Sequence, residues 1–75
     1  MKFGFAAAPV GPDGMSDDLL YAQALEDCAF GQQLGFDSAW TLEHHFTPYF
    51  PQPDLIVFLS HVAARCPGLG LGTCV

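Results

Sequence analysis

Short apolar segments alternate with longer helix-like segments along this chain, and that order constrains the fold more than any other feature. Segments 3–8, 36–42 and 69–75 are short, apolar and bordered by Pro or Gly on one side, which is typical of buried strands. Segments 17–34 and 53–65 have the length and spacing of helices. The predicted order is β-α-β-α-β, which implies an α/β fold with parallel strands and right-handed crossovers.

The first predicted helix has clear end signals and a distinct apolar face. Ser16 is a good N-cap residue, and Gly35 suits the position just after a helix. Phe30 lies on the polar face, so we expect it to contact something outside this unit. Gly31 should allow a close approach to the sheet. The apolar face consists of Leu20, Tyr21, Ala24, Leu25, Cys28 and Gly31.

The second predicted helix, from Pro53 to Arg65, is apolar nearly all round. Proline is accepted in the first turn of a helix, so Pro53 is expected there. One face can cover a sheet. The other, through Val57, Phe58 and Ala64, is expected to need a second partner.

Side-chain alternation along the predicted strands places bulk on the middle strand beside small residues on its neighbours. Trp40, Leu42 and His44 share one face of the middle strand. The corresponding faces of the outer strands carry only small side chains. We therefore expect a closely packed layer of side chains on this face of the sheet, with His44 above that layer. The small residues are Gly4, Ala6 and Ala8 on one side and Gly70, Gly72 and Cys74 on the other.

The chain has 75 residues, of which 51% are hydrophobic, and this is a large apolar fraction for so short a sequence. Three strands cannot close a barrel, because a complete (β/α)8 barrel takes about 250 residues. We therefore expect residues 1–75 to be the N-terminal piece of a longer protein.

The charge balance restricts the possible partners. Two Lys and Arg residues against eight Asp and Glu residues give a net charge of −6. This argues against nucleic acid and against an anionic membrane surface, which both attract clustered basic residues. No segment reaches the roughly 18 apolar residues of a membrane span. Cys28, Cys66 and Cys74 lack metal-site spacing and indicate buried or half-buried thiols in a reducing, cytoplasmic compartment.

Glu43, His44 and His45 follow the second predicted strand, at the edge where parallel α/β folds place their sites. Three interpretations compete: a metal site, a structural hydrogen-bonding role, and acid–base or cofactor chemistry. Neighbouring residues of an extended chain point to opposite sides, so His44 and His45 would chelate together only if the chain turns. Histidine suits acid–base work because its usual pKa is about 6.5.

Residues 34–46, LGFDSAWTLEHHF, resemble the luciferase-like flavin monooxygenases, most strongly the bacterial luciferase alpha-type branch. The opening MKFG and the later LGT at 71–73 are similar to the same family. The likeness extends over essentially all 75 residues. It also favours the acid–base interpretation of the histidine pair.

The resemblance implies that residues 1–75 are the N-terminal fragment of a single TIM-type barrel domain. This domain would bind reduced FMN at the carboxyl ends of its strands. In the family, O2 adds to the reduced flavin to form a C4a-hydroperoxide, which oxidises an organic substrate such as an aldehyde. A flavin reductase would supply the reduced flavin, and a homo- or heterodimer is expected. Three alternatives stay open: an F420-dependent oxidoreductase, a non-catalytic luciferase-like subunit that binds flavin or a partner, and a 75-residue protein that docks its sheet on another chain.

The resemblance also implies roles for the residues after the second strand. His44 corresponds to the catalytic histidine that gives acid–base assistance to the flavin peroxy species. Glu43 and His45 correspond to its supporting neighbours, and Leu42 would lie near the flavin ring.

The end of the third strand corresponds to a further part of the flavin site. Thr73, Cys74 and Val75 would line it, with a non-proline cis peptide expected between Cys74 and Val75. Phosphate-binding residues are expected beyond Val75. The 75-residue chain alone is therefore predicted to be inactive.

Overall fold

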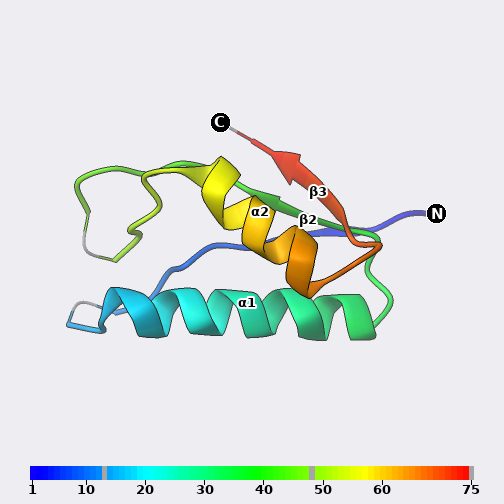
Figure 1. The fold of residues 1–75 in the computed structure, drawn as a ribbon, viewed down its shortest axis with the longest axis horizontal. Helices are drawn as coiled ribbons and strands as arrows, with labels where there is room; N and C mark the ends of the chain where they lie inside the picture. Colours follow the sequence, from blue (N-terminus) through cyan, green and yellow to red (C-terminus); the bar gives the residue numbers. More distant parts are fainter. Residues whose placement is uncertain (13, 48, 75) are drawn as a thin grey trace.

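The computed structural model describes residues 1–12, 14–47 and 49–74. It has the predicted β-α-β-α-β order, and the α/β fold class is confirmed (Figure 1). The elements are β1 (Gly4–Ala6), α1 (Asp17–Gln33), β2 (Ser38–Thr41), α2 (Leu55–Arg65) and β3 (Gly70–Thr73).

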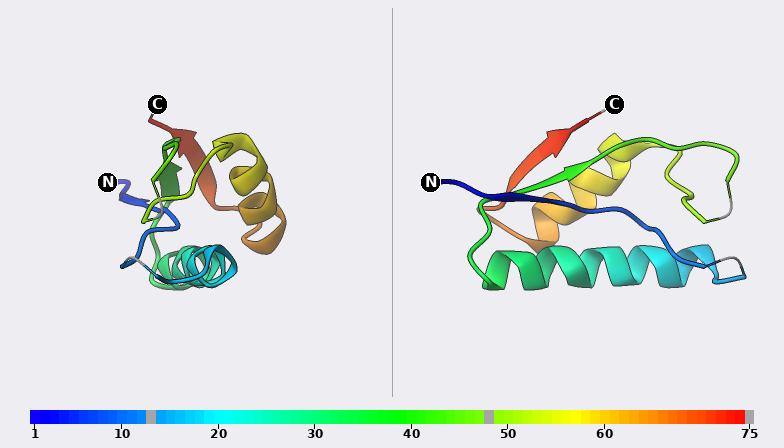
Figure 2. Two further views of the ribbon diagram at one scale, coloured as in Figure 1. Left: turned by 90° about the vertical axis from the view of Figure 1, so that its left-hand side faces the viewer. Right: turned by 180° about the vertical axis from the view of Figure 1, so that it is seen from behind.

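The three strands form one parallel sheet in the order β1-β2-β3, so β2 is the central strand. Ala39 of β2 is in register with Phe5 of β1 and with Leu71 of β3. Both helices pack on the same side of this sheet (Figure 2). This arrangement is consistent with the first part of a barrel whose helices lie outside.

The core lies between the sheet and the two helices. Ala39 is completely buried there, and Phe5 and Leu71 are partly buried against the same cluster. Gly31 of α1 faces the Phe5 ring so closely that a Cβ atom on Gly31 would lie 2.6 Å from a ring carbon. The predicted close approach of helix to sheet is confirmed.

The other face of the sheet is covered by no helix of the described chain, and Trp40 lies on it with 45% of its surface exposed. A Cβ atom on Gly72 would lie 2.4 Å from the indole ring, and one on Gly4 would lie 2.8 Å from Nε1. The expected pairing of a bulky middle strand with small neighbours is confirmed for Trp40. Its indole N–H also donates to the Ser38 hydroxyl at 2.9 Å.

The predicted start is confirmed in position for α1 and is wrong for α2. Ser16 occupies the N-cap position of α1, but its side chain makes no capping hydrogen bond. The prediction that Pro53 lies in the first turn of α2 is wrong, because Asp54 is the N-cap. Its carboxylate accepts from the backbone N–H groups of Ile56 and Val57, at 3.0 and 3.1 Å. At the other end of α1, Gly35 has a φ of 98°, as expected for its position.

The exposed apolar side chains agree with the prediction in part. Phe30 is 60% exposed and Val57 is 66% exposed. Phe58, however, was predicted on the outer face of α2 and is instead buried, with its ring centroid 5.9 Å from that of Tyr21. Of the helices in the described residues, none has the length and apolar character needed to cross a membrane.

The cysteines are free thiols in two settings. Cys28 and Cys66 are buried in the core. Cys74 is exposed, so the prediction of a buried or half-buried thiol is wrong at this position. It directly follows the edge strand β3.

Candidate active site at the carboxyl ends of the strands

The carboxyl ends of β2 and β3 lie side by side. Thr41 is in register with Thr73, and the Cys74 N–H donates to the Thr41 carbonyl oxygen at 2.8 Å. This pairing brings Leu42, which is half-buried, to the same edge as the exposed residues Thr73 and Cys74. Val75 lies outside the described residues, and so does the peptide bond that joins it to Cys74.

The loop after β2 returns on itself instead of running straight to α2 (Figure 1). The His44 N–H donates to the Gln52 carbonyl oxygen at 2.9 Å, and the Gln52 N–H donates back to the His44 carbonyl oxygen at 3.3 Å. These two bonds form an isolated antiparallel bridge. The backbone position of His44 is therefore set by a residue eight positions later.

A buried polar network lies beneath this loop. Gln52 is completely buried, and its side-chain amide donates to the Thr41 hydroxyl at 3.0 Å. The Tyr21 hydroxyl lies 3.1 Å from the Gln52 Oε1 atom and contacts the carbonyl oxygen of Pro51. Burial raises the pKa of the Tyr21 phenol, and the negative charge of Asp17 raises it further.

Gln52 is a site residue that sequence reasoning missed. A glutamine between two prolines is typical of an exposed linker, and polar side chains are rarely fully buried. No local sequence pattern could have identified Gln52, because its role depends on three-dimensional contacts with Thr41 and Tyr21.

His44 is half-buried and has an aromatic and polar surrounding. Its Nδ1 atom lies 2.9 Å from the Thr47 hydroxyl oxygen. Its ring centroid lies 5.1 Å from that of Phe50 and 6.1 Å from that of Tyr49. These contacts limit the rotation of the imidazole.

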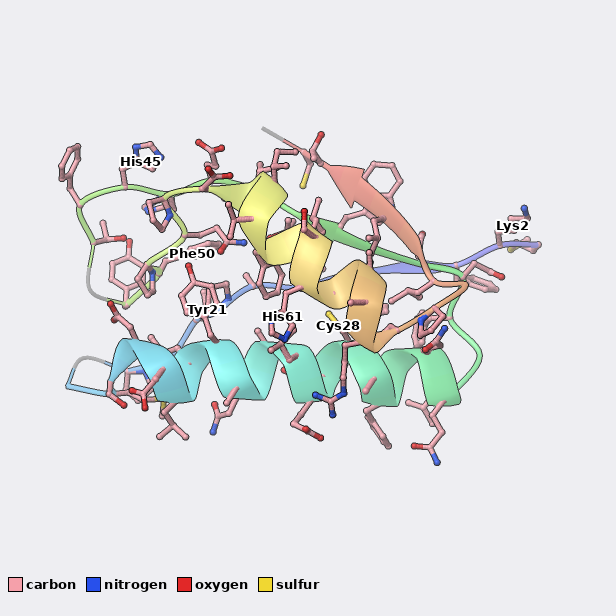
Figure 3. The ribbon with its side chains drawn as sticks, in the orientation of Figure 1. Lys2, Tyr21, Cys28, His45, Phe50 and His61 are labelled. Carbon is pink, nitrogen blue, oxygen red and sulfur yellow. The ribbon has the colours of Figure 1, made fainter. Side chains whose placement is uncertain are left out.

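His45 has a different partner. Its Nε2 atom lies 3.2 Å from a carboxylate oxygen of Glu43, and both side chains are exposed. Figure 3 shows His45 on the side of the loop away from Tyr21. The structure brings Glu43 and His45 together and keeps His44 with Thr47. Within residues 1–12, 14–47 and 49–74, no three His, Cys, Asp or Glu side chains gather into a cluster that could hold a metal ion.

An open hollow of about 470 Å³ lies between this loop and the start of α1. Pockets that bind small organic molecules have volumes of about 300–1,000 Å³. Both histidines line the hollow, as does Asp17. Its full lining is Asp17, His44, His45, Phe46, Thr47, Pro51 and Pro53.

The chain turns sharply directly after the histidine pair. Phe46 has a φ of 62°, which is the left-handed region, and its side chain is fully exposed. Such a conformation is uncommon for a large side chain. The turn allows the hydroxyl of Thr47 to reach back to the ring of His44.

Comparison with known proteins gives a match over the whole chain. The family model for luciferase-like monooxygenases matches residues 1–75. The chain belongs to the luciferase-like monooxygenase family. The family assignment made from residues 34–46 is thereby confirmed.

Two individual relatives also match the chain. The alkanal monooxygenase alpha chain of Aliivibrio fischeri is 33% identical over 73 residues, which is 97% of this chain and 21% of that protein. The uncharacterised protein y4vJ of Sinorhizobium fredii is 35% identical over 52 residues, or 69% of this chain and 15% of that one. The chain therefore spans about a fifth or less of the length of these relatives.

A solved structure of the family has the same fold. The crystal structure of monooxygenase RslO1 from Streptomyces bottropensis superposes with a TM-score of 0.81 and 35% sequence identity. The match covers 97% of this chain and 23% of RslO1. The roles predicted for Glu43, His44, His45 and the flavin-site residues stay predictions.

Proposed function

We propose that the full-length protein is a flavin-dependent monooxygenase that uses reduced FMN and O2 to oxidise a small organic substrate such as an aldehyde. The observation that carries this proposal is the juxtaposition of the strand ends 42 and 73–74 with the loop that holds His44, in a chain matched by the family throughout. The aldehyde class is supported by the name of the relative from Aliivibrio fischeri, an alkanal monooxygenase.

The residues at this edge fit a flat aromatic cofactor. Leu42 offers a half-buried apolar surface, and Thr73 and Cys74 are open beside it. No described Lys or Arg lies here to bind a phosphate: Arg65 pairs with Glu26 at 2.7 Å, and Lys2 lies at the opposite end of the sheet (Figure 3). We propose that residues beyond 75 hold the FMN phosphate.

In the proposed mechanism the bound reduced flavin supplies the activation of O2. The chain's own contribution is the control of a proton. The imidazole of His44, restrained by Phe50 and Thr47, is proposed to accept and return a proton at an oxygen atom of the reacting species. Glu43 and His45 are proposed to form the outer wall of the site, with the carboxylate orienting the second imidazole.

A turnover assay on the full-length protein tests this function. Reduced FMN is generated by a separate flavin reductase, straight-chain aldehydes are supplied, and formation of the carboxylic acid is measured. His44→Ala should lose about 100-fold or more of the rate, the usual contribution of a positioned acid–base group. The control is Gln33→Ala, because Gln33 is exposed near the end of α1 and lines neither the hollow beside His44 nor the groove between the helices.

Three outcomes would contradict the proposal. Equal turnover by His44→Ala and by the unaltered protein would remove His44 from the mechanism. Tight binding and reduction of F420, with no oxygenation in the presence of reduced FMN, would identify an F420-dependent oxidoreductase instead. A protein that binds FMN without any turnover would be a non-catalytic subunit.

We also propose that the protein dimerises through α2. Ile56 and Val57 are 60% and 66% exposed, and an apolar groove of about 340 Å³ runs between α1 and the start of α2. Val57→Asp should convert a dimer of the full-length protein to a monomer in analytical ultracentrifugation. Ala22→Asp, an exposed change on α1 outside the groove, is the control.

A further inference from the structure

The hydroxyl of Thr47 lies between two groups of the same loop. Its oxygen is 2.9 Å from Nδ1 of His44 and 3.4 Å from the carbonyl oxygen of Phe50. A hydroxyl has one proton to donate and lone pairs to accept with. A carbonyl oxygen can only accept, so a bond between Thr47 and Phe50 uses the hydroxyl proton.

The two contacts of Thr47 can both be hydrogen bonds only if Nδ1 of His44 carries a proton. If the Thr47 proton is directed to Phe50, the contact with His44 requires a proton on Nδ1 that Thr47 accepts. We propose that Thr47 is a positioning residue that holds neutral His44 in the tautomer protonated at Nδ1. The Nε2 atom is then the nitrogen with the available lone pair.

The local backbone keeps Thr47 in this place. The left-handed turn at Phe46 directs residue 47 back toward the imidazole, and the Phe50 N–H donates to the Thr47 carbonyl oxygen at 3.4 Å. The Phe50 carbonyl oxygen also accepts from the Gln52 N–H at 3.0 Å, which fixes it relative to the bridge with His44. The acceptor, the hydroxyl and the ring are therefore parts of one closed loop.

The tautomer decides which atom of His44 can do proton transfer. With Nδ1–H engaged by Thr47, the Nε2 atom accepts a proton from an acidic O–H group, and the ring becomes a cation that still donates to Thr47. The proton returns from Nε2 in the reverse step. This catalytic consequence rests on the monooxygenase function proposed above, whereas the tautomer is a property of the loop itself.

Nitrogen NMR of the full-length protein labelled with 15N-histidine tests the tautomer. The His44 signals are assigned by their loss in His44→Gln and followed through a pH titration to the neutral end point. We expect Nδ1 at the position of a protonated ring nitrogen and Nε2 at that of an unprotonated one. The opposite pattern in the unaltered protein would overturn the proposal.

Two substitutions separate the hydroxyl from the shape of the side chain. Thr47→Val keeps the branched shape and removes the hydroxyl, so the ratio of the Nδ1–H to the Nε2–H tautomer should fall about fivefold, the equivalent of one ordinary hydrogen bond. Thr47→Ser keeps the hydroxyl and should retain the original ratio. An unchanged ratio in Thr47→Val, with the other histidine signals undisturbed, would also overturn the proposal.

The test does not depend on turnover, so its failure is distinct from failure of the proposed function. If His44 has the expected tautomer but the protein oxygenates no substrate, the positioning role of Thr47 is supported and the proposed monooxygenase function is contradicted. If both hold, Thr47→Val should lower kcat more than it changes KM, and Thr47→Ser should restore kcat.

Discussion

The side-chain amide of Gln52 donates a 3.0 Å hydrogen bond to the hydroxyl of Thr41, and both residues are buried. Thr41 is the last residue of β2, and Gln52 is the residue whose backbone pairs with His44. One side chain thus joins the end of the central strand to the loop that carries the proposed catalytic residue.

Gln52→Leu should therefore destabilise the protein by about 1–3 kcal/mol, because it leaves the buried Thr41 hydroxyl without its donor. Urea unfolding of the full-length protein measures this cost. Gln23→Leu, an exposed change on α1, is the control and should cost less than about 0.5 kcal/mol. Equal effects of the two changes would contradict the role given to the buried amide.

Asp54→Ala should cost about 1 kcal/mol of unfolding free energy, since it removes the carboxylate that caps α2. Asp54→Asn should restore most of this stability. Ser16→Ala offers a matched comparison at the other helix start, where the side chain makes no capping bond, and should have a smaller effect. A larger loss for Ser16→Ala than for Asp54→Ala would show that the capping assignment is wrong.

Gly31→Ala should destabilise the contact between α1 and β1, because its Cβ atom would lie 2.6 Å from the Phe5 ring. Overpacking costs about 1–3 kcal/mol, and the gain in helix propensity offsets up to about 1 kcal/mol of it. A double-mutant cycle with Phe5→Leu measures the coupling by thermal unfolding. The cost of Gly31→Ala should fall in the Phe5→Leu background, and simple additivity would argue against the steric clash.

Alkaline pH should weaken the fold through Cys28. Burial, with smaller contributions from Cys66 and the charge of Asp27, raises the pKa of its thiol from 9.0 to about 11. Between these two pH values the unfolded chain loses a proton that the folded chain keeps, so stability falls as pH rises. Unfolding measured from pH 8 to 11 should show a shallower decline in Cys28→Ala than in Cys74→Ala, the exposed control. Identical slopes in the two variants would exclude Cys28 as a source of the pH dependence.

The sequence predicted the elements well because their signals are local. The spacing of Leu20, Ala24 and Cys28 identified the buried face of α1, and alternation along the strands correctly placed Trp40 beside small residues of β1 and β3. Phe58 was assigned to the wrong side of α2, because a helix that is apolar nearly all round gives little information about orientation.

The sequence predicted where along the chain the candidate site lies, but not the contacts within it. The end of a strand indicated where His44 would lie, but the path of the following loop depends on pairing between residues 44 and 52. Gln52 and Thr47 have no local signature, because their partners are set by that path and by the side chain of Tyr21. The proposed catalytic roles of Glu43, His44 and His45 remain predictions, because they depend on a bound ligand.

The glycines beside Trp40 also influence the position of the candidate active site. A slip of β2 by one residue would turn Trp40 toward the helices and Ala39 toward the open face, because side chains alternate along a strand. The space next to Gly4 and Gly72 accepts the indole, whereas the helix-facing layer around Ala39 is closed. Strand β2 is therefore held in one register. The position of His44 relative to the sheet depends in turn on Trp40, four residues earlier.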